Sequence, residues 1–138
     1  MDPVSVKKFI SSYNLFYGKY KILKRCIDNH DTDREAVKNE INQLELYIEI
    51  IRSCLHILTA EERFIIQLHL IQQFNWRQTL ALYEQHSGKS CCKSDRTLKR
   101  IQSTAINKIT RFMERSDIEQ YVLSALAAWD PPADCEQA

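Results

Sequence analysis

Apolar side chains recur every three or four residues along most of this chain, which is the spacing of one face of an α-helix. The clearest run lies between Ser94 and Met113, with a stripe made of Leu98, Ile101, Ala105, Ile109 and Phe112. Ser94 is a good N-cap, because its hydroxyl accepts hydrogen bonds from the free amides of a first helical turn. The pattern predicts one long helix from Ser94 to Met113.

Two long apolar patterns precede this run. We expect one helix from Pro3 to about Cys26 and another from about Asp33 to Ile57, with a short polar turn between them. Apolar residues of the second helix alternate spacings of four and three, as in a coiled-coil seam: Val37, Ile41, Leu44, Ile48, Ile51, Leu55 and Leu58. Two such helices joined by a short turn should fold as an antiparallel hairpin.

Three shorter helices have start signals of their own. These are a Thr59–Glu62 capping box before a helix to about Ile71, Asn75 before a helix from Trp76 to about His86, and a Ser116–Glu119 capping box before a last helix. In a capping box the side chains at the two ends each accept a hydrogen bond from the other residue's amide. Pro131 and Pro132 are expected to end the last helix.

The fold class predicted from these patterns is all-α. We expect an antiparallel helical hairpin over 1–57, a helix-turn-helix unit over 58–113, and a C-terminal helix with an acidic tail over 114–138. The composition agrees, because two Gly and three Pro among 138 residues are few for a fold with many β-turns.

Several apolar residues lie off the hairpin seam and predict contacts with another helix or another subunit. Tyr47, Ile50, Leu126 and Trp129 form more apolar surface than a short hairpin can cover, so we expect a homodimer held by the hairpin, either alone or together with the last helix. No run of about 18 apolar residues occurs, so we expect no membrane span. The N-terminus lacks the apolar stretch of a signal peptide, and we therefore expect a cytoplasmic protein.

Charge is strongly segregated along the chain, although the net charge is only +1. Seven basic residues and one acid lie between Gln85 and Met113, whereas six acids and one base follow. A local basic face of this kind attracts phosphates more than the total charge indicates. The alternative is a helix face that is merely solvated.

The segment from Leu58 to Ile109 resembles region 4 of sigma factors and the related small late transcription regulators of phages and mobile elements. The resemblance is carried by LTAEERFIIQLHL, by WRQTL and by SDRTLKRIQSTAINKI. The chain departs from the family pattern at Thr79 and Leu80, where Ile-Ala is usual, and the turn from Glu84 to Lys93 is longer. The resemblance implies a helix-turn-helix whose second helix, 94–113, enters the major groove of double-stranded DNA.

The resemblance also implies which residues meet the DNA. Base contacts are implied for Asp95, Arg96, Lys99 and Arg100, and a place near the DNA backbone is implied for Trp76, Arg77 and Gln78. Ser103 belongs to the same polar face, and phosphate contacts are expected from residues at its margins, Lys89, Lys93, Lys108 and Arg111. By itself, Trp76 fits an inter-helix anchor better than a base-stacking residue. The function expected is that of a sequence-specific transcription regulator.

Two other classes of function are alternatives. In the first, the sigma-like unit is a protein-interaction module that binds RNA polymerase or another regulator instead of DNA. In the second, the chain is an enzyme, which is disfavoured because no catalytic constellation is visible. No metal site or cofactor is expected, since the four His are scattered and the five Cys lack ligand spacing. Cys91 and Cys92 lie beside lysines, which leaves a redox role as a minor alternative.

Overall fold

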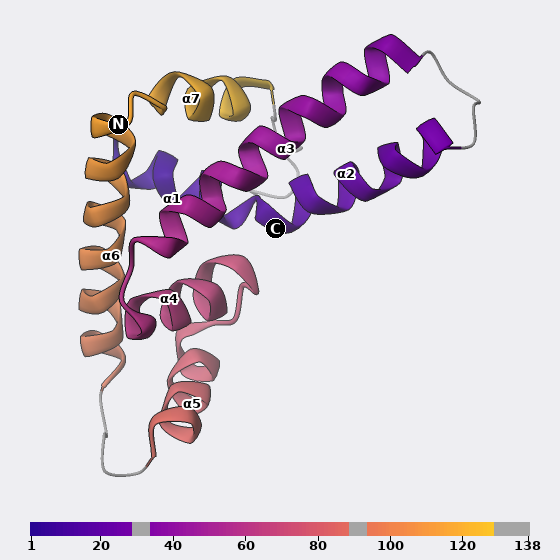
Figure 1. The fold of residues 1–138 in the computed structure, drawn as a ribbon. Coiled ribbons are helices and arrows are strands. Elements are labelled where there is room, and N and C mark those ends of the chain that lie inside the picture. The colour runs from indigo at the N-terminus through magenta and orange to yellow at the C-terminus, as the bar shows by residue number, and fades with distance from the viewer. Residues whose placement is uncertain (29–33, 89–93, 129–138) are drawn as a thin grey trace.

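In a computed structural model the described residues are 1–28, 34–88 and 94–128. The expected features at Lys89, Lys93, Cys91, Cys92 and Trp129 lie outside them. All described elements are helices, which confirms the all-α prediction (Figure 1). In order they are α1 (Pro3–Ser11), α2 (Tyr13–Asp28), α3 (Arg34–His56), α4 (Ala60–Ile66), the π-helical turn η1 (Gln67–Ile71), α5 (Trp76–Ser87), α6 (Asp95–Arg115) and α7 (Glu119–Ala128).

Helices α2 and α3 form the expected antiparallel hairpin, which extends as an arm from the body of the molecule (Figure 1). The residues predicted for the seam are buried along α3, namely Ile41, Leu44, Ile48, Ile51 and Leu55. At the edge of the pair, the Lys19 ammonium lies 2.7 Å from a carboxylate oxygen of Glu40. Both side chains are half-exposed, so this ion pair contributes little stability compared with the seam.

The prediction of one continuous helix from Pro3 to Cys26 is wrong, because the chain bends at Ser12 between α1 and α2. The Ser12 hydroxyl donates to the carbonyl oxygen of Lys8 at 2.8 Å, and such back-bonding competes with the helical ladder. Just past the bend, the side-chain amide of Asn14 donates a hydrogen bond to the carbonyl oxygen of Ile71 at 3.1 Å. The bend turns α1 away from the hairpin arm and into the body of the molecule.

Tyr47 and Ile50 of α3 are buried within the chain, so they do not form the exposed patch expected of them. The Tyr47 ring packs edge-on against Phe9 of α1, with centroids 6.3 Å apart, and lies 5.3 Å from the ring of Phe16. Tyr47 thus meets α1 and α2 of the same chain, and Ile50 belongs to the main hydrophobic core. The homodimer stays a prediction that these two residues no longer support.

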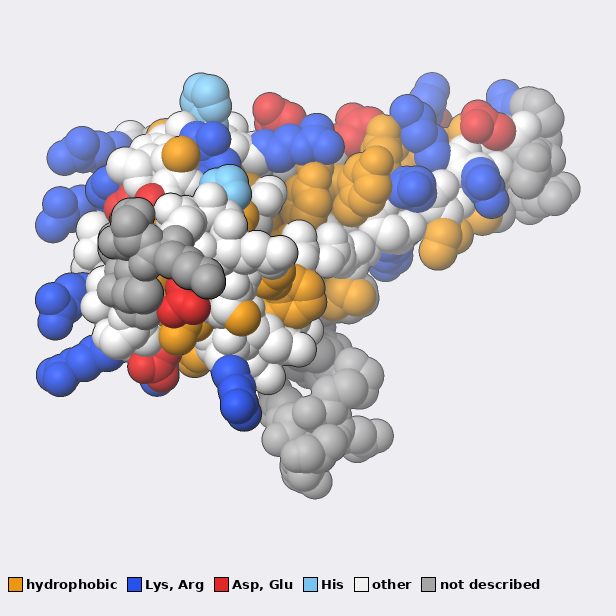
Figure 2. Space-filling view, turned by 90° about the horizontal axis from the view of Figure 1, so that it is seen from below, with side chains coloured by type: hydrophobic (Ala, Val, Ile, Leu, Met, Phe, Trp, Pro, Cys, Tyr) orange, Lys and Arg blue, Asp and Glu red, His pale blue; other side chains and the backbone are white. Residues whose placement is uncertain are grey.

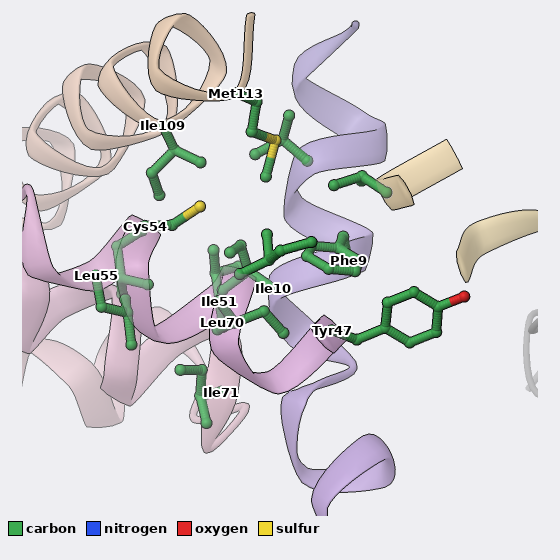
Figure 3. Close-up of a cluster of buried hydrophobic side chains, with 14 of the residues drawn as sticks. Phe9, Ile10, Tyr47, Ile51, Cys54, Leu55, Leu70, Ile71, Ile109 and Met113 are labelled. Carbon is green, nitrogen blue, oxygen red and sulfur yellow. The ribbon is translucent and has the colours of Figure 1, made fainter. Parts of the chain in front are cut away.

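The main hydrophobic core joins the N-terminal helices to the C-terminal ones (Figure 3). Phe9 and Ile10 of α1 meet α3, η1 and α6 there, in a cluster that includes Ile51, Cys54, Leu70, Ile71, Ile109 and Met113. This core crosses the boundary predicted after residue 57, so α4, η1 and α6 are built onto the hairpin. Burial also raises the pKa of the Cys54 thiol to about 12.

The last helix begins later than predicted. Ser116 is the C-cap of α6 and Asp117 adopts a positive φ of 57°, which ends α6 and changes the direction of the chain (Figure 1). α7 then begins at Glu119, where the carbonyl oxygen of Ile118 accepts the first helical hydrogen bonds. The expected capping box at Ser116 is therefore wrong, because the left-handed turn at Asp117 separates the serine from the helix. None of the described helices is long and apolar enough to cross a bilayer.

Candidate nucleic-acid interface

Helices α4, α5 and α6 pack against one another at the lower end of the molecule in Figure 1. The N-caps predicted for α4 and α5 are confirmed, and in each the capping residue exchanges two hydrogen bonds with the residue three positions later. The Thr59 amide donates to Glu62 Oε1 at 2.9 Å, and the Glu62 amide donates to the Thr59 hydroxyl at 3.2 Å. The same exchange joins Asn75 and Gln78 at distances of 3.1 and 2.8 Å. Gln78 is therefore part of the α5 cap as well as a residue of its exposed first turn.

A small second core holds the three helices together. It consists of one buried residue from each helix, Ile65, Tyr83 and Leu98, with Phe64, Trp76, Leu80 and Ile101 packed around them. Leu98 and Ile101 belong to the stripe predicted for α6, so the stripe does face a core. Further along α6, Ala105, Ile109 and Met113 continue into the main core. One face of α6 is thus fixed along its length, and the opposite face is left to solvent.

Trp76 stands between α5, η1 and the start of α6. Its ring stacks on His69 with centroids 3.7 Å apart, and the ammonium of Lys99 lies 5.9 Å from its centroid. The His69 Nδ1 is 2.9 Å from the carbonyl oxygen of Phe74. Burial lowers the pKa of His69, which favours the neutral ring in this stack. Trp76 is therefore an inter-helix contact, as its position alone suggested.

The N-terminal turns of α6 expose most of the residues implied to contact bases. Ser94 caps the helix by accepting from the Thr97 amide at 3.3 Å. After it, five exposed side chains follow one another on the solvent side: Asp95, Arg96, Lys99, Arg100 and Ser103. The Lys99 ammonium is 3.9 Å from Asp95 and also lies over Trp76. Arg77 is exposed on the first turn of α5.

Two further exposed residues extend this face: Arg111, which was predicted as a phosphate contact, and Asn107, which was not among the predicted contacts. Asn107 and Arg111 follow Ser103 at successive spacings of four, so they continue one ridge along the helix. The ridge begins at Arg96 and Arg100, and we call these five residues the α6 ridge. The 3.6-residue period of α6 could have identified Asn107 as a member of this face from the sequence alone. Figure 2 shows Lys and Arg side chains projecting along the edge where α6 lies.

Lys108 lies elsewhere, between α6 and the cap of α4. Its ammonium is 2.9 Å from Oε1 of Glu62, whose side chain is only 8% exposed. Burial by itself raises the pKa of the Glu62 carboxyl, but hydrogen bonds from the Thr59 amide and from Lys108 outweigh it, and the pKa is lowered. Sequence reasoning found the cap but not this ion pair, because the two partners are 46 positions apart.

The other metal-ligating and nucleophilic side chains do not assemble into a site within the described residues. No cluster of His, Cys, Asp and Glu that could hold a metal ion occurs among the described residues. Cys26 and Cys54 are free thiols. Gln102, on the buried side of α6, has a buried amide oxygen without a hydrogen-bond partner among the described residues. It lies between the small core and the main core, and it presents nothing to the solvent face.

Comparison with protein-family models, with curated proteins and with solved structures finds no match to this chain. We therefore infer function from the geometry of α4, α5 and α6 and from the charge of the α6 ridge.

Proposed function

We propose that this protein binds double-stranded DNA in a sequence-specific manner and regulates transcription, with the first half of α6 in the major groove. The observation that carries the proposal is the α6 ridge, an exposed row of Arg and amide side chains on a helix whose opposite face is buried. A helix presented in this way fits the width of the major groove. The resemblance to sigma factor region 4 and to phage or mobile-element regulators supports the same function.

The ridge has the right chemistry for reading bases. An arginine can donate two hydrogen bonds to O6 and N7 of guanine, which discriminates against other bases by about 1–3 kcal/mol. Arg96 and Arg100 are one turn apart on the exposed side, at the end of α6 that the small core holds against α5. We propose these two residues as the principal base contacts. Lys99 has a different role, because Asp95 and Trp76 hold its ammonium close to the protein.

Contacts to the DNA backbone come from the margins of the interface. Arg77 at the first turn of α5 is the described candidate there, and the dipole of that helix end also favours a phosphate. The proposed roles of Lys89 and Lys93 concern residues outside the described part of the chain. Lys108 is weaker as a phosphate contact than its position in the sequence implied, because its ammonium is paired with Glu62.

The alternative function is a protein-interaction module that binds RNA polymerase or another regulator. A specific observation favours keeping it: aliphatic side chains are exposed on the hairpin arm, among them Ile22 at 65% and Leu15 at 50%. DNA contacts do not need such residues.

Selection from a pool of random duplexes, followed by sequencing of the bound fraction, tests the proposal. We expect one short motif to be enriched by the wild-type protein. The double variant Arg96→Ala/Arg100→Ala should enrich no motif or a degraded one. As a control, Lys8→Ala/Lys38→Ala removes the same charge from exposed positions outside α6 and should enrich the wild-type motif. Equal recovery of all sequences by the wild-type protein would contradict sequence-specific binding.

A further inference from the structure

The solvent side of α2 has an apolar stripe that nothing in the described chain covers. Phe16 is buried on the inner side of α2, toward α3 and α1. On the opposite side, Leu15, Gly18 and Ile22 follow one another at spacings of three and four, which places them in one row. Leu15 is 50% exposed and Ile22 is 65% exposed. Isolated exposed aliphatic residues are common, but Leu15 and Ile22 lie in one row with Gly18 between them.

Gly18 leaves the backbone of α2 open between the two aliphatic side chains. A glycine inside a helix costs about 1 kcal/mol relative to alanine. A Cβ atom added at Gly18 would meet no described atom within 4 Å, so no described part of the chain needs the small residue. Beside it lies a shallow hollow of about 480 Å³ whose lining includes Gly18, Tyr20 and Ile22.

Basic side chains lie along one side of this hollow. Lys21, Lys24 and Arg25 line it together with one acid, Asp28. Lys24 is held in place, since its ammonium donates to the Tyr20 hydroxyl at 3.0 Å and lies 5.3 Å from the centre of that ring. The Lys21 ammonium likewise lies 5.4 Å from the centre of the Tyr17 ring. Positive charge therefore lies along one side of the apolar stripe. Figure 2 shows hydrophobic, basic and acidic side chains intermixed along the hairpin arm.

We propose that this face of α2 is a docking surface for an acidic amphipathic helix of a partner protein. Aliphatic side chains of the partner would lie over Gly18 between Leu15 and Ile22, where the missing Cβ permits close approach. Its carboxylates would pair with Lys21 and Arg25, which follow Gly18 at spacings of three and four and so lie beside the stripe. Charge complementarity is the argument for this occupant, and the mode is that of a helix laid along an apolar strip.

Other occupants fit less well. A second copy seated on the same face would bring the cations of both copies together. Phosphates of a nucleic acid gain nothing from Leu15 and Ile22. A membrane-bound helix places its whole apolar face in the lipid, whereas the larger apolar residue Phe16 is already buried in this chain. An acidic protein helix uses both the aliphatic and the basic residues, and its binding is independent of DNA binding by α6.

A designed peptide probe tests the docking surface on the full-length protein. The probe is a fluorescein-labelled 21-residue amphipathic helix, about 32 Å long, with leucines on one face and glutamates beside them. Its control has lysine in place of every glutamate. We expect fluorescence anisotropy to show binding of the acidic peptide at micromolar concentrations, weakening as salt rises, and at least about tenfold weaker binding of the basic one.

Variants locate the site. Ile22→Asp and Lys21→Glu/Arg25→Glu should each weaken acidic-peptide binding at least about tenfold. Leu123→Asp, a matched change at another exposed aliphatic residue, should leave it unchanged. Circular dichroism confirms that each variant is folded. Arg96→Ala/Arg100→Ala should retain peptide binding while losing DNA specificity, so failure of either proposal can be distinguished.

Three results would overturn the docking proposal. One is equal affinity for the acidic and basic peptides, and another is unchanged affinity after Ile22→Asp. The third is a different occupant. If Ile22→Asp abolishes a dimer seen by sedimentation, or abolishes binding to vesicles with anionic lipid while the peptide does not bind, the surface serves a second copy or a membrane instead.

Discussion

The ion pair between Glu62 and Lys108 gives the sharpest prediction about stability, because it ties the cap of α4 to α6 across the helix-turn-helix unit. The changes are Glu62→Gln, which keeps an oxygen that can accept from the Thr59 amide, and Lys108→Met, which removes the ammonium but retains most of the stem. Together with the double variant they form a double-mutant cycle. The cycle isolates the interaction between the two charges.

The expected coupling follows from the geometry. A hydrogen bond to a charged group is worth about 1.5–3 kcal/mol, whereas an exposed ion pair is worth less than about 1 kcal/mol. The atoms are 2.9 Å apart, with Glu62 8% exposed and Lys108 41% exposed, so solvent screens one partner and hardly the other. We therefore expect a coupling of about 1 kcal/mol, and a loss of melting temperature of about 3 °C in Lys108→Met.

The pH dependence has a definite sign. The folded-state pKa of Glu62 is lowered from its ordinary value of 4.5. The stability that it contributes is therefore fully present above pH 4.5 and is lost as the pH falls through the folded-state pKa. Urea denaturation followed by circular dichroism, at neutral pH and at a series of acidic pH values, measures both effects. A coupling below about 0.3 kcal/mol at neutral pH, or an acid loss unchanged in Glu62→Gln, would refute this reasoning.

Three other predictions concern single positions. Phe9→Ala empties the centre of the main core and should cost about 3–5 kcal/mol in urea denaturation; a loss below about 1 kcal/mol would mean that α1 is not packed there. Gly18→Ala should raise stability by about 0.5–1 kcal/mol, since the added Cβ has open space; destabilisation would contradict this. Burial lowers the folded-state pKa of His69 from its ordinary value of 6.5, so the free energy of unfolding should fall as the pH drops below 6.5. The fall should be smaller in His69→Gln, and an identical fall in that variant would exclude His69 as the cause.

Local patterns predicted the helices well. The Thr59 and Asn75 caps and the seam of α3 could be read from the sequence, because they depend on residues within a few positions of one another. The bend at Ser12 could not, since a serine within an apolar helical pattern is compatible with a continuous helix. Nor could the late start of α7 at Glu119, because the S-x-x-E pattern gives no indication of the left-handed residue that precedes it.

Contacts between segments far apart in the chain could not be predicted from the sequence. Tyr47 appeared to be surplus apolar surface because nothing in the pattern showed that α1 would turn beneath α3. Lys108 appeared to be a free cation because its partner, Glu62, lies on another helix. For the candidate site, the helical period correctly placed Arg96 and Arg100 on the exposed side of α6. The ligand of these two arginines has to be identified by a binding measurement.

Fluorescence anisotropy across a salt series tests the central claim most directly. It compares the wild-type protein with Arg96→Ala/Arg100→Ala, on a duplex containing the selected motif and on a scrambled duplex of equal length. We predict that the wild-type protein prefers the motif by at least about a hundredfold. The variant should lose most of that preference while still binding both duplexes at low salt. If the wild-type protein binds both duplexes equally weakly, and the variant does the same, α6 does not read DNA.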